Sequence, residues 1–441
     1  MVNPTRQVFD PALVMNKSKI IMNRFGSITN DSTSKNFNTL SVSGDGKTKV
    51  IYNPQYNVTQ ATSGELLVGQ QEITILSDNK LKAKTIVLPS SDSFSSRFGS
   101  GRRLDIKINY DGNVILVGDA VDGTERNGEM LIYRFDGTIW GEPQRIDGIG
   151  EPSKAYFSGF GNAISKDGSL ICGGNYRATT RPLRVFRYNG TSYNEEQVNT
   201  GNIKTAQALS LTNDNQEICV SSRGPTYVIE IYKYNNGEWS VVWVGDRLNP
   251  NWEAAGLPMN RINYIRLQKL DNYRLLFIPS HPSYPSSRPV ILKLDNLNKN
   301  TLPTVLQTFN NGYQYSGYVK INPEGNHLLM LNEDSGNAKY VLYKTTDNWS
   351  TYSETSKLHI YNSKIIEDIE VDTEADTGAE ITYEYLLNTN THITDDNTIY
   401  SLVNYKPYLQ ESDRIISLIK VPYGNKTTFI NGILDDVEYL E

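Results

Sequence analysis

The sequence has little of what metal sites and redox centres need. Among its 441 residues there are only two cysteines and four histidines. Cys172 and Cys219 stand apart in the apolar runs SLICGG and QEICVSS, and we expect both to be buried free thiols. The histidines show no zinc-ligand spacing, and no ladder of carboxylates suited to calcium occurs. The sequence therefore predicts no bound metal and no cofactor.

Long apolar runs and basic clusters are also missing. No stretch approaches the roughly 18 apolar residues of a membrane-spanning helix, and the N-terminal residues lack the apolar core of a secretory signal. Lys and Arg never run longer than two residues, and the net charge is −6. Duplex recognition needs a concentrated basic face. We therefore expect no nucleic-acid partner, no membrane insertion and synthesis in a cytoplasm without export.

Turn-forming and aromatic residues dominate instead. The chain has 28 Tyr against 12 Phe, 33 Gly and 44 Asn. Asn and Gly favour tight turns, and Tyr favours half-exposed strands. This composition excludes a helical bundle and a coiled coil, and it favours an all-β fold.

A repeated order of strands and turns runs along the chain. In 98–140 and 160–193 an apolar strand leads to Asp-Gly, a second strand ends in Gly, and a third strand precedes another tight turn and an aromatic residue. Weaker copies lie before and after. The first turn of each copy is centred on an acid, at Asp45, Asp111, Asp167, Asp214, Asp271, Glu324 and Asp396. Seven copies with a mean spacing near 58 residues result.

These copies predict a seven-bladed β-propeller of four-stranded antiparallel blades over 36–441, as a single domain. Two stacked β-sandwiches are the alternative. Residues 1–35 lack the pattern and are expected to form an extended N-terminal arm. The segment KSKIIMN (17–23) could add an outer strand to the last blade and close the ring, or the arm could lie on a neighbouring subunit.

Two of the copies resemble the FG-GAP type repeat, known from the propellers of integrin α subunits and from bacterial and viral relatives. The resemblance covers about 94–200. Its residues are Phe98-Gly99, Asp111-Gly112, Gly118, Gly128 and Tyr133 through Trp140, then Phe160-Gly161, Asp167-Gly168, Gly173 and Tyr188-Asn189-Gly190. The calcium-binding members carry an Asp-rich loop between their first two strands, where this chain has short turns. The resemblance implies a propeller without calcium and leaves the function open.

The Tyr- and Asn-rich composition and the N-terminal arm resemble those of structural proteins of tailed bacteriophages and other large viruses. On that basis the sequence predicts a non-enzymatic virion component (tail, neck, baseplate or capsid surface) that docks to other structural proteins, to further copies of itself as a homo-oligomer, or to a host surface. One alternative is a cell-surface or secreted adhesin or lectin that binds glycans. Another is a carbohydrate-active enzyme using a pair of carboxylates among Asp105, Asp119 and Glu230.

The predicted partner-binding surface is the face formed by the loops between second and third strands and between blades. Aromatic residues with Arg are enriched on interaction surfaces and on surfaces that stack saccharides. The residues we expect there are Arg102, Arg103, Tyr176, Arg177, Arg181, Trp252, His281, Tyr284 and Arg288.

Overall fold

The fold was taken from a computed structural model of the chain, and all of its regular elements among the described residues are β-strands. The described residues are 21–29, 40–54, 71–77, 80–87, 104–119, 129–147, 161–174, 181–199, 201–206, 208–222, 228–246, 262–270, 272–279, 289–298, 302–309, 319–322, 324–334, 337–361, 366–367, 381–382, 384–396, 398–406, 413–421 and 428–430.

The strands form units of four neighbours that follow one another along the chain. Unit 1 has β2 (Leu40–Val42), β3 (Thr48–Pro54), β4 (Gln71–Ser77) and β5 (Lys80–Val87). Unit 2 has β6 (Leu104–Ile108), β7 (Val114–Asp119), β8 (Glu129–Arg134) and β9 (Gln144–Asp147). Unit 3 has β10 (Asn162–Ile164), β11 (Leu170–Gly174), β12 (Leu183–Tyr188) and β13 (Tyr193–Asn199).

The next three units repeat this order. Unit 4 has β14 (Ala208–Leu211), β15 (Glu217–Ser221), β16 (Val228–Asn235) and β17 (Glu238–Asp246). Unit 5 has β18 (Ile262–Lys269), β19 (Tyr273–Pro279), β20 (Val290–Leu294) and β21 (Thr304–Thr308). Unit 6 has β22 (Val319–Ile321), β23 (His327–Asp334), β24 (Asn337–Lys344) and β25 (Ser353–Tyr361).

The last unit combines the two ends of the chain. Unit 7 has β28 (Glu384–Ile393), β29 (Ile399–Lys406) and β30 (Asp413–Val421), and its outer strand is β1 (Ile21–Thr29), antiparallel to β30. The short strand β31 (Thr428–Ile430) lies parallel to β25, and β26 (Ile366–Glu367) pairs with β27 (Ile381–Thr382). Units 3 and 4 are fused into one sheet, because β13 runs parallel to β17.

The first turns of units 2 and 3 are built in the same way. Gly112 and Gly168 take positive φ values of 73° and 69°, as the Asp-Gly signals predict. At the start of these two turns, Asn109 Oδ1 accepts from the Val114 amide (2.7 Å) and Ser165 Oγ accepts from the Leu170 amide (2.9 Å). The side chain thereby satisfies a backbone donor that the turn would otherwise leave without a partner.

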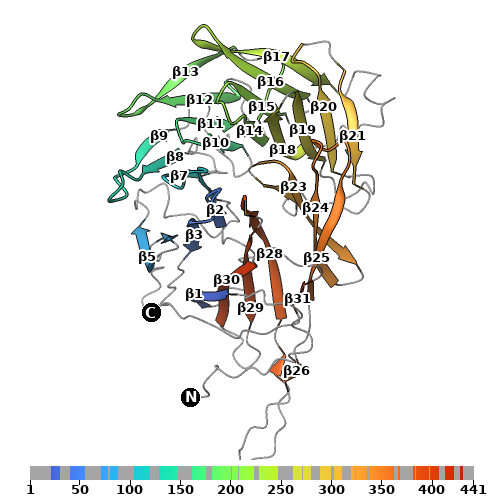
Figure 1. Cartoon of the computed structure of the whole chain (residues 1–441). Helices are drawn as coiled ribbons and strands as arrows, with labels where there is room; N and C mark the ends of the chain where they lie inside the picture. The colour runs from blue at the N-terminus through green and yellow to red at the C-terminus, as the bar shows by residue number, and fades with distance from the viewer. Residues whose placement is uncertain are drawn as a thin grey trace, which may run out of the picture.

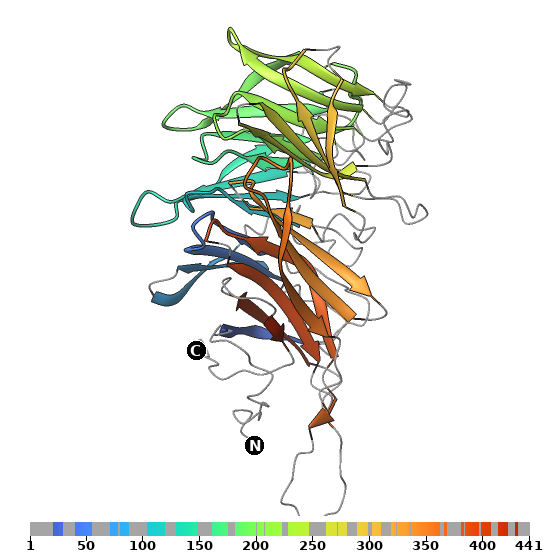
Figure 2. The same cartoon turned by 45° about the vertical axis from the view of Figure 1, so that its right-hand side comes forward.

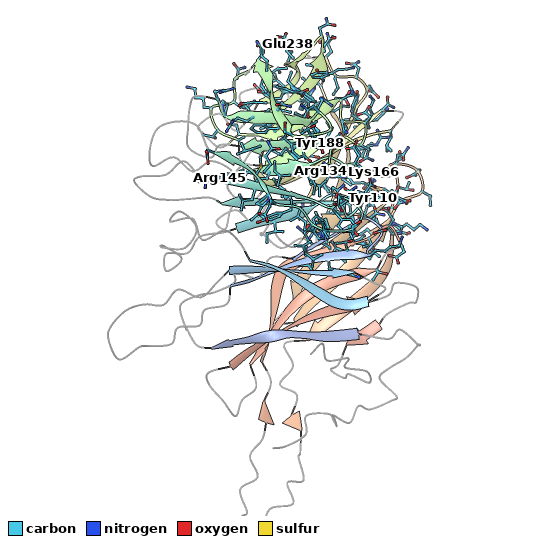
Figure 3. The ribbon with its side chains drawn as sticks, turned by 90° about the vertical axis from the view of Figure 1, so that its left-hand side faces the viewer. Tyr110, Arg134, Arg145, Lys166, Tyr188 and Glu238 are labelled. Atoms are coloured by element: carbon cyan, nitrogen blue, oxygen red, sulfur yellow. The ribbon has the colours of Figure 1, made fainter. Side chains whose placement is uncertain are left out.

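The core lies between consecutive units. One apolar cluster joins Val50 and Ile75 of unit 1 to Ile115 of unit 2, and further clusters join units 2 to 3, 3 to 4, 4 to 5 and 5 to 6. Polar contacts also join consecutive units. The Arg134 guanidinium of unit 2 lies 3.9 Å above the centre of the Tyr188 ring of unit 3 (Figure 3). Units 2 to 5 therefore bury apolar side chains against both of their neighbours.

The units are arranged around a common centre, as a β-propeller (Figures 1 and 2). The first strands of neighbouring units lie next to one another, with β2 beside β6, β6 beside β10, and β10 beside β14. The last unit returns to the first, because β28 contacts β2 as well as β22. The all-β and propeller predictions are confirmed.

Two smaller predictions can also be compared with the structure. Cys172 and Cys219 are both free and buried, as expected, and burial raises the pKa of each thiol. Across the described part of the chain, no helix has the length and apolar character needed to span a membrane.

The packing between units predicts a graded response to added methyl groups. A Cβ on Gly174 would lie 2.8 Å from Ala206 Cβ and 3.0 Å from two backbone oxygens, whereas a Cβ on Gly141 would meet only the Arg134 oxygen at 3.7 Å. We expect Gly174→Ala to lower the free energy of unfolding by about 1–3 kcal/mol through overpacking. Gly141→Ala should be neutral or slightly stabilising. Urea unfolding of the two variants measures this, and equal stability would contradict the packing described.

Candidate functional site

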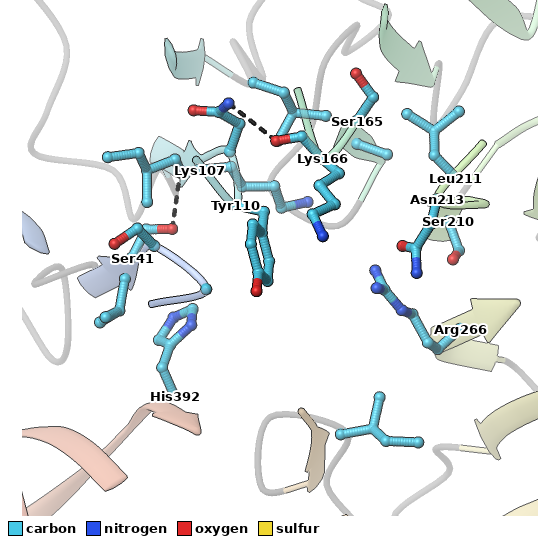
Figure 4. A pocket seen from close by; sticks show the side chains of 18 of the residues that line it. Ser41, Lys107, Tyr110, Ser165, Lys166, Ser210, Leu211, Asn213, Arg266 and His392 are labelled. Atoms are coloured by element: carbon cyan, nitrogen blue, oxygen red, sulfur yellow. Dashed lines mark hydrogen bonds between the residues drawn. The ribbon is translucent and has the colours of Figure 1, made fainter. Parts of the chain in front are cut away.

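A cavity of about 380 Å³ lies where the first strands of the units converge. Every one of these strands, β2, β6, β10, β14, β18, β22 and β28, contributes residues to its wall. Figure 4 shows Tyr110, Lys166, Arg266 and His392 directed toward a common open centre. We refer to this cavity as the axial pocket.

Equivalent positions of the repeat supply the wall. The residue two places before the first turn is Ser41, Lys107, Ala163, Ser210, Lys320 or His392, and all of these line the axial pocket. The turns themselves form its mouth, with Gly44, Tyr110, Lys166, Asn213, Glu324 and Asp395. Two positions of the repeat, one on the first strand and one in the turn after it, therefore supply most of the polar side chains of the pocket.

Arg266, on β18, is a half-buried cation on the wall of the axial pocket. Among the described residues it has no hydrogen bond and no ion pair, and its Nε atom is enclosed without an acceptor. Figure 4 shows its side chain reaching from β18 toward the centre. A guanidinium carries a fixed charge and five donors, so a site that leaves it without an anion is poised to receive one.

Two lysines of the pocket are tied to the neighbouring units. Lys107 Nζ, from β6, donates to the Asn162 carbonyl oxygen of unit 3. Lys166 Nζ, in the turn after β10, lies 4.0 Å above the centre of the Tyr110 ring. Together with Arg266 and Lys320, these residues bring four cationic side chains to the pocket wall.

Tyr110 and Asp395 join units 2 and 7 across the mouth. The Tyr110 hydroxyl donates to Asp395 Oδ2, and this hydrogen bond, with burial, raises the pKa of Tyr110 to about 12. Burial raises the pKa of the Asp395 carboxyl above its usual value, against the opposing effect of the hydrogen bond from Tyr110. Asp395 Oδ1 is enclosed and accepts no hydrogen bond from a described residue.

Gly44 is what allows Tyr110 to take this position. A Cβ on Gly44 would lie 1.9 Å from Tyr110 Cδ2, so the ring packs directly on the glycine backbone. The Gly44 amide donates to the Tyr110 carbonyl (2.9 Å), and the Asp395 amide donates to the Gly44 carbonyl (3.1 Å). The first turns of units 7, 1 and 2 are thus connected in sequence along one side of the mouth.

His392, on β28, joins the last unit to the first. Its Nε2 atom donates to the Leu40 carbonyl oxygen at 2.8 Å. Burial, reinforced by the charges of Lys320 and Lys107, lowers the pKa of His392 to about 3. The imidazole is therefore neutral near pH 7.

The axial pocket carries a net charge of +2, because four cationic side chains stand against the two carboxylates of Glu324 and Asp395.

The structure places only one of the predicted surface residues. Arg181 is exposed, has a φ of 53°, and forms an ion pair with Glu195 at 2.7 Å; it does not line the axial pocket. The others lie outside the described residues, namely Arg102, Arg103, Tyr176, Arg177, Trp252, His281, Tyr284 and Arg288.

Of the three carboxylates considered for glycoside hydrolysis, the structure describes the side chain of Glu230 alone. The side chains of Asp105 and Asp119 lie outside the description. Glu230 is fully buried and accepts from the Tyr232 hydroxyl and the Asn202 amide, both at 2.6 Å, and it is not part of the axial pocket. Its role is to hold the segment before β14 against β16.

The axial pocket was not predicted from the sequence, because the predicted binding surface lies at the opposite end of the strands. The predicted face is formed by loops after second strands, whereas the pocket mouth is formed by the turns after first strands. A signal was available in the repeat. The residue before the acid of the first turn varies (Gly44, Tyr110, Lys166, Asn213, Asp395), while the turn keeps Asp followed by Gly or Asn. Such a variable residue on a fixed scaffold is expected of a binding position.

Comparison with known proteins gives only distant structural neighbours. No protein-family model and no curated protein matches the chain. A putative 6-phosphogluconolactonase from Bacteroides uniformis aligns with a TM-score of 0.45 and 12% identity over 72% of this chain and 83% of its own. The periplasmic gluconolactonase PpgL of Pseudomonas aeruginosa aligns with a TM-score of 0.46 and 11% identity over 74% of this chain and 86% of its own. The Cps50 (Swd1) β-propeller domain of Myceliophteria thermophila aligns with a TM-score of 0.46 and 8% identity over 90% of this chain and 99% of its own.

These neighbours correct two predictions made from the sequence. The prediction of a non-enzymatic virion component is contradicted, because two of the three structures are lactonases by name and none is a virion protein. The prediction that the chain is not an enzyme is contradicted by the same two structures. The physical reason for the error is the axial pocket, whose polar side chains lie far apart in sequence and gather only when the ring forms. The names describe those proteins and assign no activity to this chain.

His392 predicts a specific loss of stability in acid. An unfolded histidine titrates near pH 6.5, so between that value and about 3 the unfolded chain binds a proton that the folded chain does not. Stability should therefore fall as the pH drops through this window. His392→Gln should remove up to about 1.4 kcal/mol of this loss per pH unit.

Urea unfolding between pH 4 and pH 6 measures that slope. His327, whose pKa burial lowers to about 4, provides the matched comparison, because His327→Gln should remove a similar contribution and the double variant should remove both. An unchanged slope in His392→Gln would show that this histidine is not held neutral.

Proposed function

We propose that the protein is a ligand-binding propeller whose axial pocket takes up a small anion. The single observation that carries the proposal is Arg266, a cation on the pocket wall with no hydrogen bond or ion pair among the described residues. A buried donor without an acceptor costs about 1–3 kcal/mol. A bound anion would supply that acceptor and offset the cost.

The charge of the pocket supports an anionic ligand. The whole chain carries a net charge of −6, yet the axial pocket carries +2. The positive charge is therefore a local property of the site and does not follow from composition. A cleft lined by one sign of charge between low-dielectric walls concentrates ligands of the opposite sign.

The size of the pocket limits the ligand to a small molecule. A volume of about 380 Å³ lies near the lower end of the 300–1,000 Å³ typical of small-molecule sites. Serine and threonine hydroxyls on the wall suit a polar ligand of monosaccharide size. The two alternatives that the sequence left open, glycan binding and a carbohydrate-active enzyme, both begin with binding of such a molecule, and the proposal concerns that step.

We propose further that the ring has seven blades, which correspond to the strand units, and that β1 is its closing strand. The pairing of β1 with β30 supports this, as does the His392 contact with Leu40 between units 7 and 1. Closure from both ends of the chain would keep the first strands at fixed positions around the axial pocket.

Removal of the Arg266 charge should weaken binding of small anions. Charge-assisted hydrogen bonds contribute about 1.5–3 kcal/mol, so we expect Arg266→Gln to raise the Kd for an anionic monosaccharide by roughly 10- to 100-fold. Isothermal titration calorimetry with glucose 6-phosphate and with glucuronate, at low salt, measures this.

A matched control is available in Arg145→Gln. Arg145 is half-exposed, pairs with Asp147 on its own strand and does not line the pocket, so this variant loses the same charge elsewhere. It should leave the Kd unchanged within about twofold. If neither anion binds the unmodified protein, or if both variants weaken binding equally, the proposal is wrong.

A further inference from the structure

The donors of the axial pocket surround its centre. Arg266 comes from unit 5, Ser210 from unit 4 and Ser41 from unit 1, and each lines the same cavity (Figure 4). Lys107 from unit 2 and Lys320 from unit 6 complete the set. Hydrogen-bond donors therefore approach the centre from five different units around it.

Each of the two serines accepts one hydrogen bond from the backbone of the next unit. Ser41 Oγ accepts from the Ile108 amide at 3.0 Å, and Ser210 Oγ accepts from the Leu267 amide at 3.0 Å. Both residues are 3% exposed. A serine hydroxyl also has one proton to donate, and no described residue accepts it. On the wall of the pocket, Ser41 and Ser210 thus serve as donors toward whatever occupies the centre.

From this arrangement we infer that the ligand is a phosphate monoester, bound as its dianion with the phosphate at the centre of the ring. The inference rests on the proposed anion-binding function. The pocket charge of +2 matches a dianion. A phosphate monoester offers three terminal oxygens to donors on several sides, whereas a carboxylate offers two oxygens in one plane.

The carboxylates set the orientation of such a ligand. Glu324, Asp395 and Lys166 belong to the turns at the mouth, whereas the strands behind it carry three cations, Lys107, Arg266 and Lys320, and no carboxylate. Like charges repel, so the phosphate group is placed among the cations and the organic part of the ester extends toward the mouth. There Glu324, Asp395 and Asn213 offer oxygen acceptors for hydroxyl groups.

The test uses the pH dependence of binding, because a phosphate monoester loses its second proton near pH 6. The charged and titratable groups that line the pocket are Lys107, Tyr110, Lys166, Arg266, Lys320, Glu324, His392 and Asp395. His392 stays neutral from pH 5 to pH 7 because its pKa is lowered to about 3, and Tyr110 stays protonated because its pKa is raised to about 12.

Calorimetric titrations at pH 5 and pH 7 with two matched probes decide the matter. Glucose 6-phosphate should bind about tenfold more tightly at pH 7, as the dianion fraction rises from about 9% to about 91%. Glucuronate has the same ring size but carries a carboxylate that is ionised at both values, and it should bind more weakly with little pH dependence. A titration of the protein itself would shift the affinity of both probes in the same direction, so glucuronate is the internal control.

The outcomes separate this inference from the proposed function. If glucuronate binds as tightly as glucose 6-phosphate, or if the pH trend of the two probes is the same, the phosphate assignment is overturned while the anion site stands. If neither probe binds, the proposed function itself fails. Inorganic phosphate is the third probe. Binding of inorganic phosphate tighter than that of glucose 6-phosphate would overturn the ester assignment, and weaker binding would support it.

Discussion

Consecutive strand units of this protein, from unit 1 to unit 6, bury apolar side chains against each other, and that packing determines the rest of the structure. The apolar clusters all lie between consecutive units. A four-stranded antiparallel unit cannot bury both faces alone, but a ring of such units can. Formation of the ring brings the first strands to a common centre and so creates the axial pocket. The pocket is a consequence of the packing, and its chemistry comes from the residues that happen to face it.

The scaffold and the site place different demands on the same short segment. In the first turn of units 2 and 3, the leading Asn109 or Ser165 and the glycine hold the backbone, and they are the same kind of residue from unit to unit. The residue just before the turn acid is free of that task. It supplies Tyr110 in unit 2, Lys166 in unit 3 and Asp395 in unit 7. A constant turn with one variable position allows a repeated fold to carry a site that is not symmetric.

Much of the fold could be predicted from the sequence, because it depends on local signals. Asp-Gly and Asn-Gly mark turns that need positive φ, and Gly112, Gly168 and Gly190 take it. The buried thiols followed from apolar runs. The pocket could not be predicted in the same way, since Lys107, Arg266 and His392 lie in different units and meet only when the ring closes. Arg266 in particular is one arginine in an ordinary strand pattern, and only its lack of a partner among the described residues sets it apart.

The central claim is that an anion occupies the centre of the ring, and a crystal structure of the protein with glucose 6-phosphate tests it most directly. The account predicts electron density for the phosphate group within hydrogen-bond distance of the Arg266 guanidinium and the Ser210 hydroxyl. Density for the ligand elsewhere on the protein, with only solvent beside Arg266 at a saturating ligand concentration, would contradict it.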